Sequence, residues 1–110
     1  MFLLEENKNN RITLTRGDDV AFRMAPNWKD GGEYQLQKGD VEEMVCRKKY
    51  GAPVAFSVVS DRTGTIRISH DDTVALEPGY YIYDITLTMA DGKVNTIVNG
   101  ATLELIREVK

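Results

Sequence analysis

The sequence has one cysteine and one histidine, and this scarcity excludes several kinds of site. Cys46 has no second cysteine with which to form an internal disulfide, so the fold depends on a hydrophobic core rather than on covalent cross-links. A structural zinc site usually takes about four Cys or His ligands, more than Cys46 and His70 supply. The same two residues could form a nucleophile and base, but a small buried hydrophobe and a capping or surface histidine fit them better.

Long hydrophobic runs are also missing. Met1 to Leu4 is apolar, but Glu5 and Glu6 follow at once, so the basic start and the extended apolar stretch of a signal peptide are both absent. No stretch approaches the length of a membrane span. We therefore expect synthesis in the cytoplasm without a signal peptide, and no membrane partner.

Positive charge is not in excess. Fourteen Lys and Arg stand against 17 Asp and Glu, which gives a formal net charge of -3, and the two signs alternate along the chain. Proteins that bind nucleic acid usually show a basic stripe that displaces counterions from phosphates. None can be drawn here, so we predict no nucleic-acid partner.

What the sequence does contain is typical of one folded unit. Its 110 residues include 42% hydrophobic and 28% charged residues, which is ordinary for a globular protein and unlike a disordered one. The length suits a single core, and residues 1–110 are therefore predicted to form one domain.

Hydrophobic residues recur mainly with a period of two, in short runs separated by Gly, Pro, Asn and Asp. This pattern predicts an all-β chain of about eight strands, arranged as an antiparallel two-sheet β-sandwich. The longest run places Tyr81, Tyr83, Ile85, Leu87 and Met89 on one face, and we expect it to be a central, buried strand. The other strands are predicted around Ile12/Leu14, Val20/Phe22/Met24, Tyr34/Leu36, Val54/Phe56/Val58, Ile66/Ile68, Val94/Thr96/Val98 and Leu103/Leu105.

The connections are less regular. Residues 26–33 are the most loop-like segment. Residues 41–48 fit either a helical stripe or a strand face containing Met44 and Cys46, and the strand is favoured because the neighbouring segments are strands. One short helical turn is predicted near residues 70–76, capped by Ser69 or His70. Asp91-Gly92 and Asn99-Gly100 are both predicted to be hairpin turns.

Three aromatic residues are the candidate interaction residues. Trp28 lies in the most loop-like segment, near Tyr34, and could stack on a sugar ring or anchor a partner protein. Tyr50 could join them. A Trp folded over the edge of the core is the simpler interpretation.

Acidic residues at strand ends suggest one further site. Carboxylates of Asp18-Asp19, Asp61 and Asp71-Asp72 could converge on calcium, although such residues usually serve turns and caps, and no spaced calcium loop is present. Arg16-Gly17-Asp18 spells an adhesion motif, but the flanking strand signals favour a turn. No acid, base and nucleophile can be assembled from the sequence, so we predict no enzyme activity and no cofactor.

Several segments together resemble a known viral family. They are residues 12–18 (ITLTRGD), 34–36 (YQL), 71–73 (DDT), 76–85 (LEPGYYIYDI), 91–93 (DGK) and 96–98 (TIV). This set resembles the amino-terminal domain of phage baseplate upper proteins, and the likeness covers most of the chain. Glu42 and Glu43 depart from that family's pattern, where alternating Val and Thr would be expected, and so does the long loop around Trp28.

The segment from Leu76 to Tyr83 also resembles the strand-entry corner of fibronectin type III and other immunoglobulin-like domains. At such a corner, a Tyr of the new strand hydrogen-bonds back to the crossing backbone while its ring packs into the core. Both likenesses imply an immunoglobulin-like sandwich.

The viral resemblance implies a phage or prophage virion structural protein, a baseplate or tail module made in the host bacterial cytoplasm. Its partners would be other virion or tail proteins, and several copies would associate into a homo-oligomer. The alternative is a carbohydrate-binding module at a bacterial surface, in which Trp28 with Tyr34 or Tyr50 stacks on a glycan.

Overall fold

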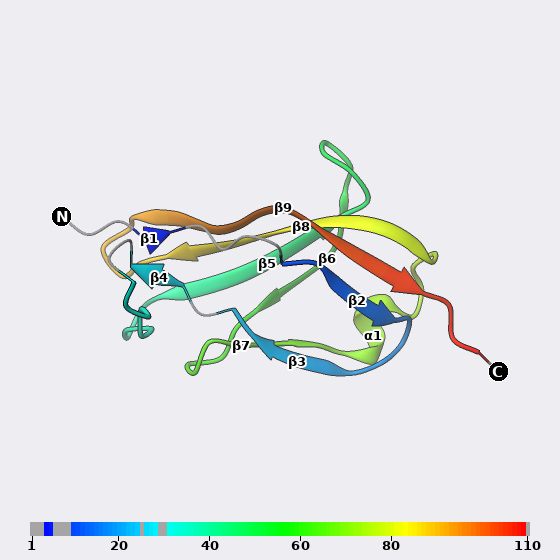
Figure 1. Ribbon diagram of the computed structural model, residues 1–110, viewed down its shortest axis with the longest axis horizontal. Helices are drawn as coiled ribbons and strands as arrows, with labels where there is room; N and C mark the ends of the chain where they lie inside the picture. The colour runs from blue at the N-terminus through cyan, green and yellow to red at the C-terminus, as the bar shows by residue number, and fades with distance from the viewer. Residues whose placement is uncertain (1–3, 6–9, 25, 29–30, 110) are drawn as a thin grey trace.

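The computed structural model describes residues 4–5, 10–24, 26–28 and 31–109. The described part is mostly β, with one short helix (Figure 1). The elements are β1 Leu4–Glu5, β2 Ile12–Thr15, β3 Val20–Arg23, β4 Asn27–Trp28, β5 Val41–Arg47, β6 Val54–Val59, β7 Thr65–Ile68, α1 His70–Thr73, β8 Gly79–Thr88 and β9 Val94–Ile106. The predicted all-β class is confirmed, with nine strands among the described residues in place of about eight.

A five-stranded sheet in the order β2-β9-β8-β5-β6 forms the main layer, and β3-β7 and β1-β4 form two smaller sheets. The predicted central strand is β8, the middle of the five. Tyr81, Tyr83, Ile85 and Leu87 are all buried, whereas Tyr80 and Thr88 on the opposite face are exposed. This prediction is confirmed for these four residues, whereas Met89 lies just after β8 and is partly buried against the core. The buried row fixes which face of the sheet holds the core.

The segment with two interpretations is a strand. β5 pairs with β8 and β6 on its two sides, and Met44 and Cys46 are fully buried. Since both neighbours are strands, pairing decides a segment that periodicity alone leaves open.

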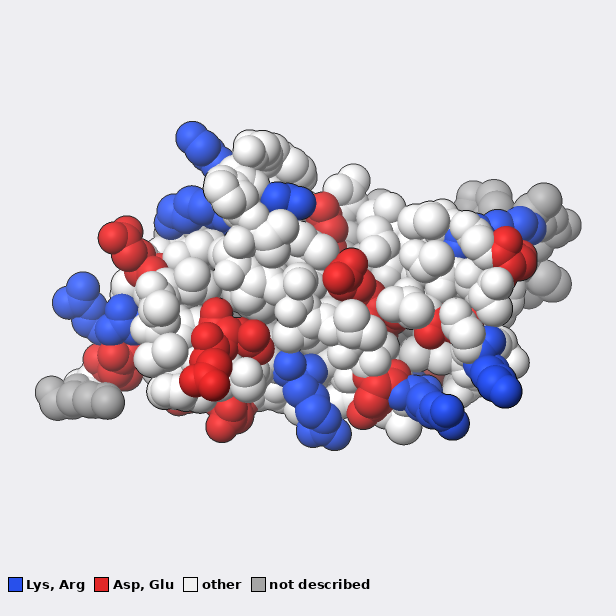
Figure 2. Space-filling model, turned by 180° about the vertical axis from the view of Figure 1, so that it is seen from behind, with Lys and Arg blue, Asp and Glu red and all other residues white. Residues whose placement is uncertain are grey.

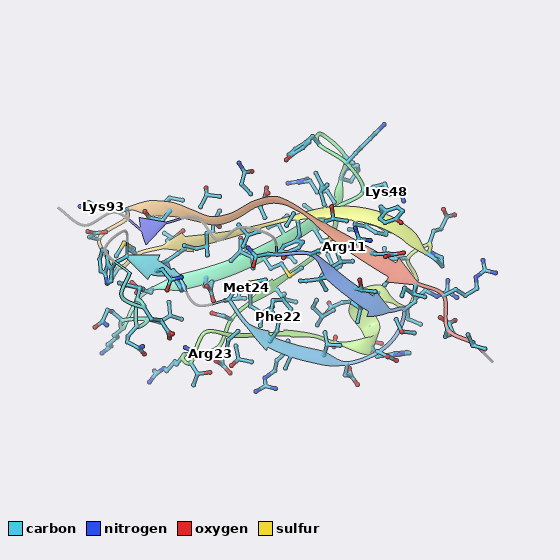
Figure 3. The ribbon with its side chains drawn as sticks, viewed as in Figure 1. Arg11, Phe22, Arg23, Met24, Lys48 and Lys93 are labelled. Atoms are coloured by element: carbon cyan, nitrogen blue, oxygen red, sulfur yellow. The ribbon has the colours of Figure 1, made fainter. Side chains whose placement is uncertain are left out.

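The β3-β7 pair contributes to the same hydrophobic core as the main sheet. Ile66 and Ile68 of β7 belong to the same core cluster as Tyr83 and Ile85, and Phe22 and Met24 pack against that cluster. Figure 3 shows Phe22, Arg23 and Met24 along and just beyond β3. The core therefore contains side chains from both the five-stranded sheet and β3-β7.

The prediction of purely antiparallel pairing is wrong at one edge. β2 runs parallel to β9, with Ile12 opposite Leu103 and Leu14 opposite Leu105. A period of two is the same for parallel and antiparallel strands, so the sequence pattern could not distinguish them.

The predicted hairpin at Asn99-Gly100 is also wrong, since β9 continues through it. The register against β8 shifts there, from Ile85 opposite Val98 to Tyr83 opposite Ala101. Gly100 has a φ of +68° and donates its N–H to the Asp84 carboxylate at 2.6 Å. The residues that would suit a tight turn therefore form a β-bulge, which needs the same left-handed glycine. The turn at Asp91-Gly92 is confirmed, closed by the Met89 N–H on the Lys93 carbonyl at 2.7 Å.

The region before β5 departs from prediction in two ways. The segment predicted as a loop contains β4, which is paired with β1, and Tyr34 to Leu36 form no strand. Instead Tyr34 donates its N–H to the Pro26 carbonyl at 2.8 Å, which closes a small hairpin around Trp28.

The helical turn after β7 is confirmed as α1. The Asp72 carboxylate accepts hydrogen bonds from the Ser69 N–H and hydroxyl at 2.8 and 3.0 Å. The following corner is confirmed too, because the Tyr81 hydroxyl donates to the Glu77 carbonyl at 2.7 Å. Within the described residues, no helix is long and apolar enough to cross a membrane.

Candidate interaction surface

Two of the three predicted interaction residues lie together. The rings of Trp28 and Tyr34 meet edge to face, with centroids 5.4 Å apart. Trp28 is half-buried and packs against the core cluster, and Tyr34 is buried. Much of the Trp28 ring therefore covers the edge of the core, which leaves only part of it for a ligand.

Asp40 holds the Tyr34 end of this pair in place. One carboxylate oxygen accepts from the Tyr34 hydroxyl at 2.5 Å and the Gln37 N–H at 2.8 Å, and the other accepts from the Ala90 N–H at 2.9 Å. Burial, together with the Asp40 hydrogen bond, raises the pKa of Tyr34 to about 12. The Tyr34 hydroxyl is thus a structural group that ties the approach to β5 to the β8–β9 turn.

A hollow of about 480 Å³ lies beside this cluster. It is lined by residues of the segment before β5 and of the β6–β7 turn: Leu36, Gln37, Lys38, Gly39, Asp40, Ser60, Asp61 and Arg62. The lining carries both charge signs and little aromatic surface, so it offers polar contacts without a stacking platform.

Tyr50 lies elsewhere. It is 70% exposed, in the turn between β5 and β6, and its hydroxyl lies over Gly100 in the bulge of β9. Tyr34 comes before β5 and Tyr50 after it, so the two lie at opposite ends of that strand. The structure brings Trp28 and Tyr34 together and separates Tyr50 from both.

The acidic residues serve local structure. Asp19 accepts the His70 N–H at 2.7 Å, and Asp61 accepts the N–H groups of Thr63 and Thr65 at 2.8 and 3.1 Å. Among the described residues, no three or more of His, Cys, Asp and Glu are grouped so as to hold a metal ion.

Arg16-Gly17-Asp18 forms the predicted turn. Asp18 donates its N–H to the Thr15 carbonyl at 3.1 Å, Gly17 has a φ of +83°, and Arg16 forms an ion pair with Glu108 at 2.7 Å. His70 packs on the same turn, with Nδ1 2.6 Å from the Gly17 carbonyl oxygen. Cys46 is fully buried, and burial raises the pKa of its thiol to about 12, which keeps it protonated and a poor nucleophile.

Glu42 is the one buried acid among the described residues, and sequence reasoning did not single it out. Its side chain lies on the same face of β5 as Met44 and Cys46, is 1% exposed, and neither carboxylate oxygen accepts a hydrogen bond from a described residue. Burial raises its pKa to about 7. The Ser60 side chain and the positive charge of Arg23 lower this pKa by smaller amounts. The period of two along β5 places Glu42 on the same face as Met44, and this pattern in the sequence was a signal for its burial.

The clearest exposed feature is the outer edge of β6. β6 ends the five-stranded sheet, and no described strand pairs with its outer side. Ser60 donates its N–H to the Glu42 carbonyl at 2.8 Å, and antiparallel strands bond through alternate residues. The N–H and C=O groups of Ser57 and Val59 therefore point away from β5, toward solvent.

This edge carries no charge. The sequence of β6 is VAFSVV, and Val54 and Val59 are 46% and 57% exposed. The opposite edge, β2, is four residues long and flanked by Arg11 and Arg16, both held in ion pairs. Proteins usually protect long edge strands with charge, a bulge or a cover, because free backbone groups recruit other strands.

Partial protection exists at one end of β6 only. Pro53 precedes the strand, and a register shift at Cys46/Arg47 displaces Val54. The open part of the edge thus runs from Phe56 to Val59. Elsewhere the surface is mixed, and Figure 2 shows basic and acidic side chains interspersed over the face seen from behind.

The sequence matches no protein family and no curated protein. Among solved structures, the chain is similar to murine CRIg, with 14% sequence identity over 99% of this chain and 98% of that chain and a TM-score of 0.40. A similarity this loose carries no argument about partners or activity.

Proposed function

We propose that this chain is a virion structural module of a tailed phage or prophage, which works by protein–protein contact through the free edge of β6. The observation that carries the proposal is an uncharged six-residue edge strand with half-exposed valines and outward-pointing backbone groups. Strand addition at such an edge supplies main-chain hydrogen bonds to a partner without any pocket.

The resemblance to baseplate upper proteins supports the same function. The segments that carry it are β2 with its turn, residues 34–36 before β5, α1, the corner at Leu76 to Tyr81, the first part of β8 and the β8–β9 hairpin. Those in β2, β8 and β9 belong to the half of the main sheet that lies away from β6, and none of the segments is part of β6 itself. The segments that resemble the family therefore form the scaffold in this proposal. The β6 edge lies outside them and is the proposed contact surface.

The proposal includes a more specific fold, an immunoglobulin-like sandwich of two facing sheets. It is supported by β8 lying between β9 and β5, by one core cluster that joins residues of the main sheet with residues of β3-β7, and by the hydrogen bond from Tyr81 to Glu77. In such a sandwich the strands of the two sheets cross at about 30°. A crystal structure in which the two sheets cross at a clearly different angle would contradict this part of the proposal.

The function can be tested on particles. Tail particles purified from induced cells should contain the chain in a fixed ratio to the tail proteins, measured by quantitative mass spectrometry through a density gradient. A chain that stays in the soluble fraction while intact particles form would contradict the proposal. The glycan alternative predicts instead that a glycan array binds the chain and that Trp28→Ala abolishes this binding.

A further inference from the structure

The Glu42 carboxyl group lies in the core without a hydrogen-bonding partner among the described residues. A Cβ added at Gly64, in the β6–β7 turn, would lie 3.9 Å from Glu42 Oε1 and 3.7 Å from Leu36 Cδ1. The carboxyl group therefore lies beside this turn, at a place to which Gly64 brings no side chain.

Arg23 reaches the same place from the end of β3 (Figure 3). The same added Cβ would lie 4.0 Å from Arg23 Nε, so the Arg23 and Glu42 side chains flank one point of the turn. Arg23 bonds toward the surface, where Nε donates to the Thr63 carbonyl at 3.0 Å and the guanidinium forms an ion pair with Glu33 at 3.1 Å. The two side chains of this ion pair are 50% and 41% exposed. Rotation about its own side-chain bonds is enough to turn the Arg23 guanidinium from the surface toward Glu42.

The charge of Glu42 decides which partner Arg23 prefers. An exposed ion pair contributes little to stability, because water screens it and two long side chains must be ordered. A charged carboxylate buried without a partner is strongly destabilising. While Glu42 is neutral, Arg23 gains nothing by leaving Glu33. Once Glu42 is charged, pairing it outweighs the loss of the surface ion pair, and Glu33 keeps a second donor in Gln35 Nε2 at 3.4 Å.

No other described cation is as well placed. On β8 the residue opposite Glu42 is the apolar Leu87, and Glu43 lies on the outward face of β5. The remaining charged groups of the segment before β5, the β6–β7 turn and β7 are Lys38, Asp40, Asp61, Arg62 and Arg67. Asp40 is bonded to Tyr34, and Asp61 lies 3.8 Å from Arg67. Arg23 is the charged group that lowers the pKa of Glu42.

We propose that Arg23 exchanges partners when Glu42 loses its proton, leaving Glu33 and the Thr63 carbonyl to form an ion pair with Glu42. Arg23 joins β3 to the β6–β7 turn and to the segment before β5, so the exchange releases both from the end of β3. The pKa of Glu42 is raised to about 7, so the carboxyl group is neutral below this pH and charged above it. The exchange therefore occurs as pH rises through neutrality. It involves neither the β6 edge nor a partner chain, and it is independent of the proposed function.

The test follows both side chains by NMR in the labelled full chain. Between about pH 5 and about pH 9, the Glu42 carboxyl carbon and the Arg23 Nε–H should titrate with one shared midpoint. Crystal structures from the two ends of this range should show the Arg23 guanidinium on Glu33 and Thr63 at low pH and on Glu42 at high pH.

Two substitutions separate this exchange from a fixed Arg23. Glu42→Gln should make the Arg23 signal independent of pH, whereas Glu43→Gln, on the outward face of the same strand, should leave its titration unchanged. Arg23→Gln removes the cation that pairs with the charged carboxylate, so it should raise the Glu42 midpoint by at least about one pH unit. Arg62→Gln removes a cation of the β6–β7 turn and should shift this midpoint by much less.

Three results would overturn the proposal. They are an Arg23 signal that does not change with pH in the wild type, an Arg23 signal that still titrates in the Glu42→Gln protein, or a Glu42 midpoint that is the same with and without Arg23. Thermal melting of each variant at low pH, where Glu42 is neutral, reports whether the substitution leaves the fold intact. If Arg23→Gln does not fold, the Arg23 signal in the Glu42→Gln protein still decides the question.

Discussion

At the scale of single residues, Glu42 is the feature with the largest consequence for stability. A carboxyl group without a hydrogen-bonding partner in the core favours its neutral form, because burial penalises the charge. Its pKa is about 7 in the fold against 4.5 as the ordinary value. The folded chain therefore binds a proton over a pH range in which the unfolded chain has released it.

The sign of the pH effect follows from this difference. Between about pH 4.5 and about pH 7 the free energy of unfolding falls as pH rises, because the folded state binds more protons. One pKa unit corresponds to about 1.4 kcal/mol, so the loss amounts to about 3 kcal/mol at pH 8. Urea denaturation at pH 5 and pH 8 should show it, and Glu42→Gln should remove most of the difference.

The matched control is Glu43→Gln, on the outward face of the same strand, which should leave the pH dependence of the wild type intact. If the Glu42→Gln protein keeps the full pH dependence, Glu42 is not the group that titrates.

Tyr81 gives a second prediction at this scale. Tyr81→Phe keeps the ring in the core but loses the hydrogen bond to the Glu77 carbonyl, and should lower the free energy of unfolding by about 1 kcal/mol. Tyr80→Phe, at the exposed neighbouring position, should change it by less than about 0.5 kcal/mol. Equal effects in urea denaturation would show that the corner hydrogen bond contributes nothing.

At the scale of elements, the bulge in β9 depends on Gly100. A side chain there has a backbone cost, because φ is +68°, and a smaller second cost, because an added Cβ would displace the hydroxyl end of the exposed Tyr50 side chain. Gly100→Ala should destabilise the chain by about 1–2 kcal/mol, measured by thermal or urea denaturation.

Gly51 separates the two costs. It has a φ of +81° with nothing near an added Cβ, so Gly51→Ala carries the backbone cost alone. Gly100→Ala should therefore be the more destabilising of the two, and adding Tyr50→Ala should bring it close to Gly51→Ala. A Gly100→Ala protein as stable as the wild type would show that β9 does not need the bulge.

The elements also show what the sequence could and could not predict. β8 was predictable because five alternating residues from Tyr81 to Met89 allow one face to be assigned without knowledge of the partners. Asn99-Gly100 was misassigned because a left-handed glycine serves a turn and a bulge equally well, and only the Asp84 hydrogen bond decides between them. The parallel pairing of β2 with β9 depends on tertiary contacts between distant segments, and neither segment's own sequence indicates it.

The candidate surface was less predictable than the fold. Aromatic residues drew attention to Trp28 and Tyr34, but their contact with the core and with Asp40 is formed by segments distant in the fold. The free edge at β6 depends on which strand ends the sheet, and that order is not encoded in any single segment. The uncharged run VAFSVV was the available signal, and it has meaning only once the sheet order is known.

At the scale of the whole molecule, the two edges of the main sheet differ in kind. One is short and bordered by arginines in ion pairs, and the other is uncharged with open backbone groups. This asymmetry gives the molecule one side suited to strand addition. The proposed structural role in an assembly rests on this asymmetry more than on any single side chain.

The most direct measurement is backbone amide hydrogen exchange by mass spectrometry, compared between the free chain and the chain in purified tail particles. The account predicts that the Ser57 and Val59 amides exchange freely in the free chain and at least about tenfold more slowly in the particles, while Thr13 on the opposite edge does not change. Unchanged exchange at Ser57 and Val59, or protection that appears at β2 instead, would contradict the assignment of β6 as the contact edge.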